Sequence, residues 1–360
     1  MTTGTELWRD PRGRATRTLL EASSSLLLAS AKRALAGARV LWRSLPRSVR
    51  EWISPSSRWP GLAYVLSYIA TYDETHDLGT FAGNLVVVHQ RYSGSSTDEK
   101  EKLEKQFDKI MEGLAMPNGV QKMTRRLRQH SILAKVLADE RCRPQKSAIT
   151  VLDVPSSSGV AALDSFEMLR QYYMIRAYVL GDLGFHVHYD TARECVFDED
   201  FNLLQVRLGK RFFSIYRGHR SGDVYTPLTG ALLFPLDVVA WYLKKRYVYS
   251  TKSQTVPLFL IHPDVDSRLK RGDFSLSRID VFKGIGEHYD LILSFNFLQR
   301  NYFPREQIAR GVANLTNALN EQGILIMGND ESFSVAQKRA GKLVVIKEDR
   351  VTEGGVPTPG

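Results

Sequence analysis

Two aspartates at the ends of apolar runs are the residues best placed to bind a small polar ligand. Asp153 lies at the end of the run that begins at Ile149, and Asp182 ends the run 174–182, 29 residues after Asp153. In a βαβ unit, an acid at the end of the second strand can accept hydrogen bonds from both ribose hydroxyls of a nucleoside. The spacing therefore predicts a nucleoside site, with a helix cap or a turn as the alternative role for Asp182.

The residues between these acids predict a strand, a tight turn and a helix. Residues 149–154 form a short apolar run that is typical of a strand buried on both faces. Pro155, three serines and Gly159 follow, a turn with no bulky side chain. Residues 160–169 then carry apolar side chains at helical spacing. Backbone N–H groups at the start of such a helix face a ligand beside the strand end.

This stretch resembles motif I of the Rossmann-like S-adenosylmethionine-dependent methyltransferases, in which an apolar strand and an acid precede G-x-G-x-G. The acid here is Asp153, and the glycine positions hold Pro155, Ser157 and Gly159, so only the last glycine is kept. The resemblance implies S-adenosyl-L-methionine as the cofactor, bound by these four residues and Asp182. A generic strand–turn–helix of another α/β protein is the alternative.

Residues 289–329 resemble motifs IV to VI of the same superfamily. An apolar strand precedes Asn296, a helical pattern covers 304–319, and a second strand follows. The text is most similar to that of the chemotaxis receptor glutamate methyltransferases, although extra residues precede Tyr302 and the Pro-Gly pair of that family is missing. This likeness implies a carboxylate acceptor, and the divergence leaves a hydroxyl or amine acceptor open. The family pattern also implies cofactor contacts at three further residues: Asp280, Val281 and Asn296.

The catalytic residues are less defined by the sequence. A methyl group on a sulfonium is already activated, so positioning supplies most of the catalysis, and only a hydroxyl acceptor needs a general base. Four polar residues are candidates to face the methyl group: Asn296, Tyr216, His219 and Tyr225. The missing glycines at 155 and 157 leave a catalytically inactive scaffold as a rival interpretation.

Composition and charge are those of a globular protein with a basic first segment. Hydrophobic residues make up 43% of the chain and charged residues 24%. The net charge is +10, and residues 1–60 hold 11 basic and four acidic residues, a net +7. The remainder is close to balanced, which argues against a nucleic acid partner. Two isolated cysteines and the lack of a secretory signal or an apolar membrane span predict a cytoplasmic protein.

The pattern over residues 16–45 predicts a basic amphipathic helix. It could pack on this protein or a protein partner, which we favour, or lie on an anionic membrane surface, or serve as an organellar targeting segment. A membrane-associated regulatory protein is therefore a second alternative to the methyltransferase function. The sequence defines neither the methyl acceptor nor the oligomeric state.

The expected fold is an α/β Rossmann-like methyltransferase sheet with helices on both faces, a β-hairpin insertion and an N-terminal helical domain. The expected segments are a basic, partly disordered 1–60, a helical 61–145, an α/β domain 146–350 with an insertion at about 185–250, and a flexible tail 351–360. Residues 120–140 are expected to be helical and basic at Lys122, Arg125, Arg126 and Arg128, with the three arginines on a solvated face and a binding role as the alternative. His186, His188 and Asp190 alternate along a strand, but Thr191 follows where a metal motif needs histidine, so no metal is predicted.

Overall fold

The computed structural model describes residues 81–349 except for 93, 113, 115, 117–121, 123, 125, 209–210, 216–236, 239, 251–253, 301 and 330–331. The chain divides into two compact units, and both sheets belong to the same one. Of the other unit, only residues 237–247 are partly described, and residues 240–246 of them are helical. The amphipathic helix predicted over 16–45 and the tail 351–360 lie outside the described residues.

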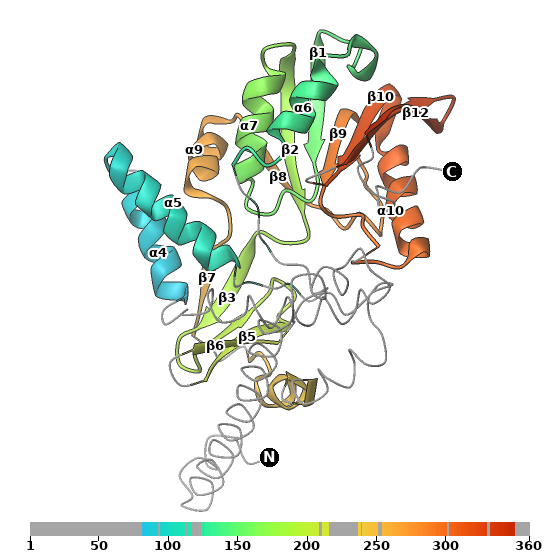
Figure 1. The fold of residues 1–360 in the computed structure, drawn as a ribbon. Coiled ribbons are helices and arrows are strands. Elements are labelled where there is room, and N and C mark those ends of the chain that lie inside the picture. Colours follow the sequence, from blue (N-terminus) through green and yellow to red (C-terminus); the bar gives the residue numbers. More distant parts are fainter. Residues whose placement is uncertain are drawn as a thin grey trace, which may run out of the picture. The chain divides into compact units, whose positions relative to one another are not determined.

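The larger sheet has seven strands in the order β12-β11-β10-β9-β1-β2-β8 (Figure 1). Neighbours from β8 through β10 are parallel, and β11 and β12 are antiparallel additions. The strands span β1 (Ala148–Asp153), β2 (Met174–Asp182), β8 (Ser275–Arg278), β9 (Tyr289–Phe295), β10 (Leu319–Gly328), β11 (Phe333–Arg339) and β12 (Lys342–Asp349). Strand β11 pairs with β10 on one side and with β12 on the other, so β12 is the outermost strand.

Helices cover both faces of this sheet because its central strands are apolar on both sides. On one face, Val151 and Leu291 belong to a core with α6 (His130–Leu137), α7 (Val160–Leu169) and α9 (Pro263–Arg271). On the other face, Leu152 and Ile292 pack with α10 (Arg305–Asn317). The predicted α/β fold with a parallel-rich sheet and helices on both faces is confirmed.

Strand order reverses beside β1. The chain leaves β1 for β2 on one side, and β9 later pairs with the other side of β1. Such a reversal opens a crevice at the carboxyl ends of the strands, where α/β proteins bind ligands. The residues after β1, β2 and β9 therefore come together at one end of the sheet.

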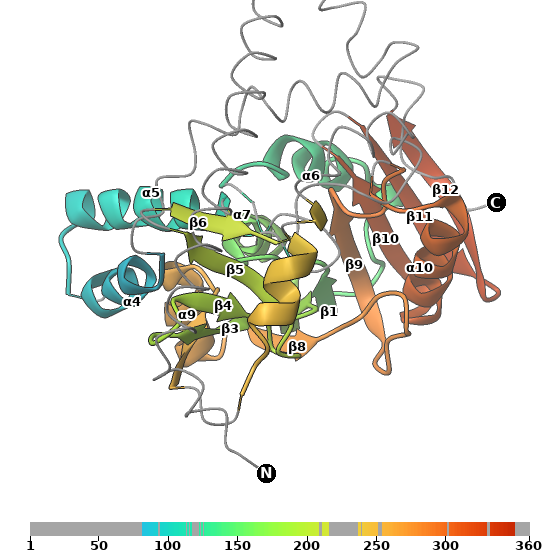
Figure 2. The ribbon, with the colours of Figure 1, turned by 90° about the horizontal axis from the view of Figure 1, so that it is seen from below.

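A second sheet of five antiparallel strands, in the order β6-β5-β4-β3-β7, forms most of the insertion (Figure 2). Its strands are β3 (His186–Asp190), β4 (Cys195–Phe197), β5 (Leu203–Leu208), β6 (Arg211–Ser214) and β7 (Thr255–Phe259). The insertion thus extends past the predicted limit of 250, because β7 pairs with β3 in full register from His186 opposite Phe259 to Asp190 opposite Thr255.

Two N-terminal helices pack on one face of this second sheet. Helices α4 (Phe81–Tyr92) and α5 (Thr97–Glu112) share a core with one sheet face, in which Leu85 and Phe107 pack with Val187 and Leu258. Of the predicted helical segment 61–145, α4 and α5 therefore pack on the insertion, whereas α6 packs on the larger sheet. Within the described part of the chain, no helix has the length and apolarity that crossing a bilayer requires.

Candidate functional site

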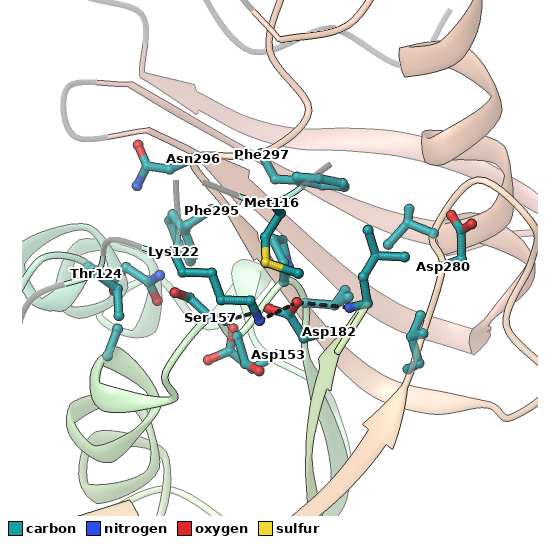
Figure 3. Close-up of a pocket in the computed structure, with 18 of the residues that line it drawn as sticks. Met116, Lys122, Thr124, Asp153, Ser157, Asp182, Asp280, Phe295, Asn296 and Phe297 are labelled. Atoms are coloured by element: carbon teal, nitrogen blue, oxygen red, sulfur yellow. Dashed lines mark hydrogen bonds and ion pairs between the residues drawn. The ribbon is translucent and has the colours of Figure 1, made fainter. Parts of the chain in front are cut away.

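A pocket opens at the carboxyl ends of β1, β2 and β9, beside the strand reversal (Figure 3). Seven of the eight cofactor-site residues expected from the sequence line it: Asp153, Pro155, Ser157, Asp182, Asp280, Val281 and Asn296. The eighth, Gly159, caps the start of α7. Tyr216, His219 and Tyr225 lie outside the described residues, so Asn296 is the catalytic candidate that the structure places at the pocket.

The turn after β1 is held by backbone hydrogen bonds to three neighbouring elements. Val154 N donates to Leu293 O at 2.9 Å, Ser156 N donates to Gly181 O at 2.8 Å, and His262 N donates to Ser158 O at 2.9 Å. These bonds link the turn to β9, β2 and the start of α9. They account for a short turn with small side chains, since each neighbouring backbone approaches it directly.

Two residues of this turn have left-handed backbones. Gly159 has φ +78°, and a Cβ there would lie 3.0 Å from a methyl group of Val265 and 3.1 Å from one of Leu180. Ser157 has φ +55°, a conformation that costs a residue with a Cβ about 1–2 kcal/mol. The motif glycine that the sequence lacks at 157 thus corresponds to a real backbone requirement, which the serine meets at a cost.

The Asp182 carboxylate ends β2 at the centre of the pocket. Its Oδ2 accepts from Ser157 N at 2.8 Å, and its Oδ1 accepts from Leu183 N at 2.8 Å and from Lys122 Nζ at 2.8 Å. A carboxylate offers about four acceptor positions. One position, on Oδ2, therefore remains for a ligand while Lys122 is bound.

The segment that carries Lys122 contradicts its predicted helix. Lys122 and Thr124 are not helical, residues 126–129 form turns, and α6 begins only at His130. Lys122 is 4% exposed and ion-paired, whereas the side chain of Arg126, which was expected on a solvated face, is 47% exposed. Ion pairs and the left-handed Leu127 (φ +59°) override the helical periodicity here.

Asp153 points into the protein and pairs with β2. Its Oδ2 accepts from the Tyr178 hydroxyl at 3.2 Å, and Asp153 and Tyr178 are 3% and 1% exposed. Burial raises the pKa of the Asp153 carboxyl to about 7, with a further increase from Asp182 and an opposing effect of the Tyr178 hydrogen bond. The motif acid therefore sits beneath the pocket as a group that titrates near neutral pH.

Three buried polar atoms at the pocket have no hydrogen-bond partner among the described residues: Ser156 Oγ, Ser157 Oγ and Gln129 Oε1. Each such atom costs roughly 1–3 kcal/mol when left unpaired. Three of them lining one pocket, next to an aspartate with acceptor capacity, are the features of a ligand site. Sequence reasoning missed Gln129 and Lys122, because no motif or periodicity distinguishes them from the surrounding polar residues.

The far wall of the pocket comes from the residues after β8 and β9. Asp280 accepts from Phe282 N at 3.0 Å and pairs with Lys283, so it forms a turn as well as lining the pocket. Asn296 has a left-handed backbone (φ +56°), and its N donates to Gly328 O at 2.7 Å. Phe297, next to it, packs against Phe282 with ring centroids 5.6 Å apart. This wall is therefore largely aromatic and suits a flat, apolar ligand group.

The histidines of β3 lie elsewhere, on the second sheet. His186 stacks on Phe259 at 4.8 Å between ring centroids, and His188 lies 4.9 Å from Phe201. Among the described residues, no group of three or more His, Cys, Asp or Glu side chains is arranged to hold a metal ion.

No protein-family model matches the sequence, and no curated protein is significantly similar to it. Similar solved structures are methyltransferases. Coclaurine N-methyltransferase, solved with N-methylheliamine and S-adenosylhomocysteine, is 13% identical at a TM-score of 0.30, over 84% of this chain and 63% of that chain.

Two bacterial methyltransferases are similar to a comparable degree. The N-methyltransferase NodS of Bradyrhizobium japonicum, solved with S-adenosylhomocysteine, is 12% identical at a TM-score of 0.25, over 56% of this chain and 62% of its own length. An O-methyltransferase family protein of Burkholderia thailandensis is 10% identical at 0.28, over 87% and 79%. The chain thus spans less than two thirds of NodS. At these values the fold assignment rests on the strand order and register of the sheet itself.

Proposed function

We propose that this protein is an S-adenosyl-L-methionine-dependent methyltransferase whose cofactor binds in the pocket at the ends of β1, β2 and β9. The observation that carries the proposal is the placement of Asp182 and three unpaired buried polar atoms beside the strand reversal. In this proposal Asp182 accepts hydrogen bonds from the ribose, and the Asp280–Phe297 wall contacts the adenine.

The residues present fit the amino-acid end of such a cofactor as well. Ser156 Oγ and Ser157 Oγ can donate to a carboxylate, and Gln129 Oε1 can accept from an ammonium group. The start of α7, capped by Gly159, adds the favourable potential of a helix N-terminus for an anionic group. When bound, the cofactor supplies an activated methyl group. The chain binds, orients and shields it from water.

The acceptor is a carboxylate, hydroxyl or amine. The chemotaxis-enzyme likeness supports the carboxylate, which would need no general base. We propose that the side chain of Asn296 orients the acceptor or the methyl group. Asn296 lines the pocket and has a left-handed backbone. Docking of residues 16–45 on a protein partner or an anionic membrane is a separate proposal, and it concerns residues outside those described.

Calorimetric titration with S-adenosylmethionine and S-adenosylhomocysteine tests this proposal. Micromolar binding is expected for the wild type. In Asp182→Ala, two hydrogen bonds to a charged acceptor are lost, and the affinity should fall by at least about 100-fold. Asp200→Ala is the matched control, because it removes an exposed carboxylate that pairs with Arg278 at 2.6 Å. A wild type that binds neither ligand would contradict the proposal and favour the inactive scaffold.

A further inference from the structure

Lys122 occupies acceptor capacity that a ribose would need. Its Nζ lies 2.8 Å from Asp182 Oδ1 and 2.6 Å from Gly184 O, and it sits 5.8 Å above the centroid of the Phe185 ring. Figure 3 shows its side chain directed onto Asp182 across the pocket. The lysine is therefore a component of the pocket that reaches it from outside the sheet.

The hydrogen-bond count on Asp182 makes Lys122 and a ribose diol alternative partners. Ser157 N and Leu183 N are backbone donors fixed by the turn and by the end of β2. They leave about two of the four acceptor positions. A ribose that donates through both hydroxyls needs both positions, whereas Lys122 already uses one of them.

The segment around Lys122 is held by polar contacts with two aspartates, Asp182 in the pocket and Asp164 on α7. We define the basic strap as Lys122, Thr124 and residues 126–128. Arg126 pairs with Asp164 at 3.1 Å and with Asp264 at 3.5 Å, and its side chain is 47% exposed. Asp164 also accepts from Leu127 N at 2.6 Å, and its side chain is 10% exposed, so that end of the strap is fixed, whereas Lys122 is the polar anchor inside the pocket.

We propose that Lys122 competes with the cofactor ribose for Asp182, so that binding a nucleoside diol displaces the lysine and loosens the basic strap. This inference rests on the proposed function, since it concerns the same pocket. Apparent cofactor affinity is then lowered by the fraction of molecules in which Lys122 holds Asp182. The lysine thereby makes the pocket select ligands whose hydroxyls can replace an ion pair.

Replacing Lys122 by methionine, which keeps the length of the stem and removes the ammonium group, tests the competition. S-adenosylhomocysteine should bind Lys122→Met roughly tenfold or more tightly than the wild type. The 2′,3′-dideoxy analogue of this ligand has no hydroxyls to replace the lysine, so its affinity should be nearly the same for Lys122→Met and the wild type. Lys146→Met is the matched control, because Lys146 pairs with Asp290 at 2.5 Å at the opposite end of the sheet.

The outcomes separate this inference from the proposed function. Unchanged or weaker binding to Lys122→Met, with a binding wild type, would overturn the competition and leave the methyltransferase proposal standing. Weaker binding would make Lys122 a ligand of the cofactor instead. No binding to either protein would overturn both.

Hydrogen exchange on the wild type gives a second test that needs no substitution. Adding S-adenosylhomocysteine should slow exchange at residues 153–159 and speed it at residues 126–128, because the strap loses its contact with Asp182. Slower exchange at residues 126–128 would contradict displacement of Lys122.

Discussion

The two ends of the larger sheet hold similar aspartate–lysine pairs that differ in one respect. At the amino end, Asp290 accepts from Lys146 at 2.5 Å, Asn320 at 2.9 Å, and Thr150 N and Oγ1 at 3.1 and 3.2 Å. Its four acceptor positions are filled by the protein. At the carboxyl end, Asp182 has three donors, and unpaired serine and glutamine oxygens line the same pocket.

This difference separates a structural carboxylate from a candidate binding one. Both aspartates are buried and both pair with lysine, so burial and charge alone would not distinguish them. Unfilled hydrogen-bonding capacity does, because a buried group without its full set of partners is retained at a cost in stability.

Removing the Asp290 carboxylate, whose acceptor positions are all occupied, should destabilise the fold. Asp290→Ala should lower the free energy of unfolding by roughly 3–5 kcal/mol, because Lys146, Thr150 and Asn320 lose their shared acceptor. Denaturant titration measures the loss, and calorimetry at a temperature where the variant is folded should show unchanged affinity for S-adenosylhomocysteine. A large loss of affinity in the folded variant would contradict the division between the two ends.

Asp153 and Asp290, which are both buried, should affect stability with opposite pH dependence. Burial raises the pKa of Asp153 to about 7, so the folded state holds this proton more tightly than the unfolded state. The contribution of protonated Asp153 to the free energy of unfolding is complete below pH 4 and is lost as the pH rises through 7. Asp153→Asn should therefore gain stability relative to the wild type between pH 4 and 8, by up to roughly 4 kcal/mol.

Asp290 supplies the opposite sign as a control for that titration. Burial would raise its pKa, but the hydrogen bonds from Lys146, Thr150 and Asn320 outweigh this and hold the pKa below the ordinary value. Its stabilisation is present above pH 4 and is lost as the pH falls below that. Stability curves of Asp153→Asn and Asp290→Asn with the same slope would exclude this account.

The turn after β1 should be more sensitive to an added methyl group than an exposed turn with the same backbone. Gly159→Ala should cost about 2–3 kcal/mol, since the new Cβ meets Val265 and Leu180 in addition to the conformational cost. Gly272, at φ +82°, has nothing within 4 Å of such a Cβ, so Gly272→Ala should cost only about 1 kcal/mol. Equal losses in thermal unfolding would show that packing around Gly159 is looser than described.

The smallest effect concerns the serine that stands at a motif glycine. Ser157→Gly should raise the free energy of unfolding by about 0.5–1 kcal/mol, because relief of the left-handed backbone, about 1–2 kcal/mol, exceeds the entropic cost of a glycine, roughly 0.5–1 kcal/mol. Ser165→Gly within α7 should instead lower it by about 1 kcal/mol. A destabilised Ser157→Gly, measured in the same denaturant series, would indicate that the serine side chain stabilises the turn.

The β1–α7–β2 unit could be predicted because its information is local. An apolar run, a turn of small residues and a helical stripe occur in sequence between residues 149 and 169, and parallel pairing then places Asp153 and Asp182 at one end of the sheet. The resemblance to the methyltransferase superfamily implied cofactor contacts at Asp280 and Asn296, and both residues line the pocket.

The parts that were missed depend on partners distant in sequence. Strand β7 joins β3 across more than 60 residues, and no pattern in either strand specifies that choice. In the predicted helix over 120–140, the described residues before His130 are not helical, because Lys122 bonds to Asp182 and Arg126 to Asp164 and Asp264, contacts that periodicity does not encode. Gln129 belongs to the pocket for the same reason.

The most direct measurement is a crystal structure of the protein with S-adenosylhomocysteine. We expect the ligand to bind at the carboxyl ends of β1, β2 and β9, with its ribose hydroxyls donating to Asp182. Lys122 should have moved away from that carboxylate, and the contacts of Asp290 should be unchanged. A ligand bound elsewhere, or a ribose that leaves Asp182 unengaged, would contradict it.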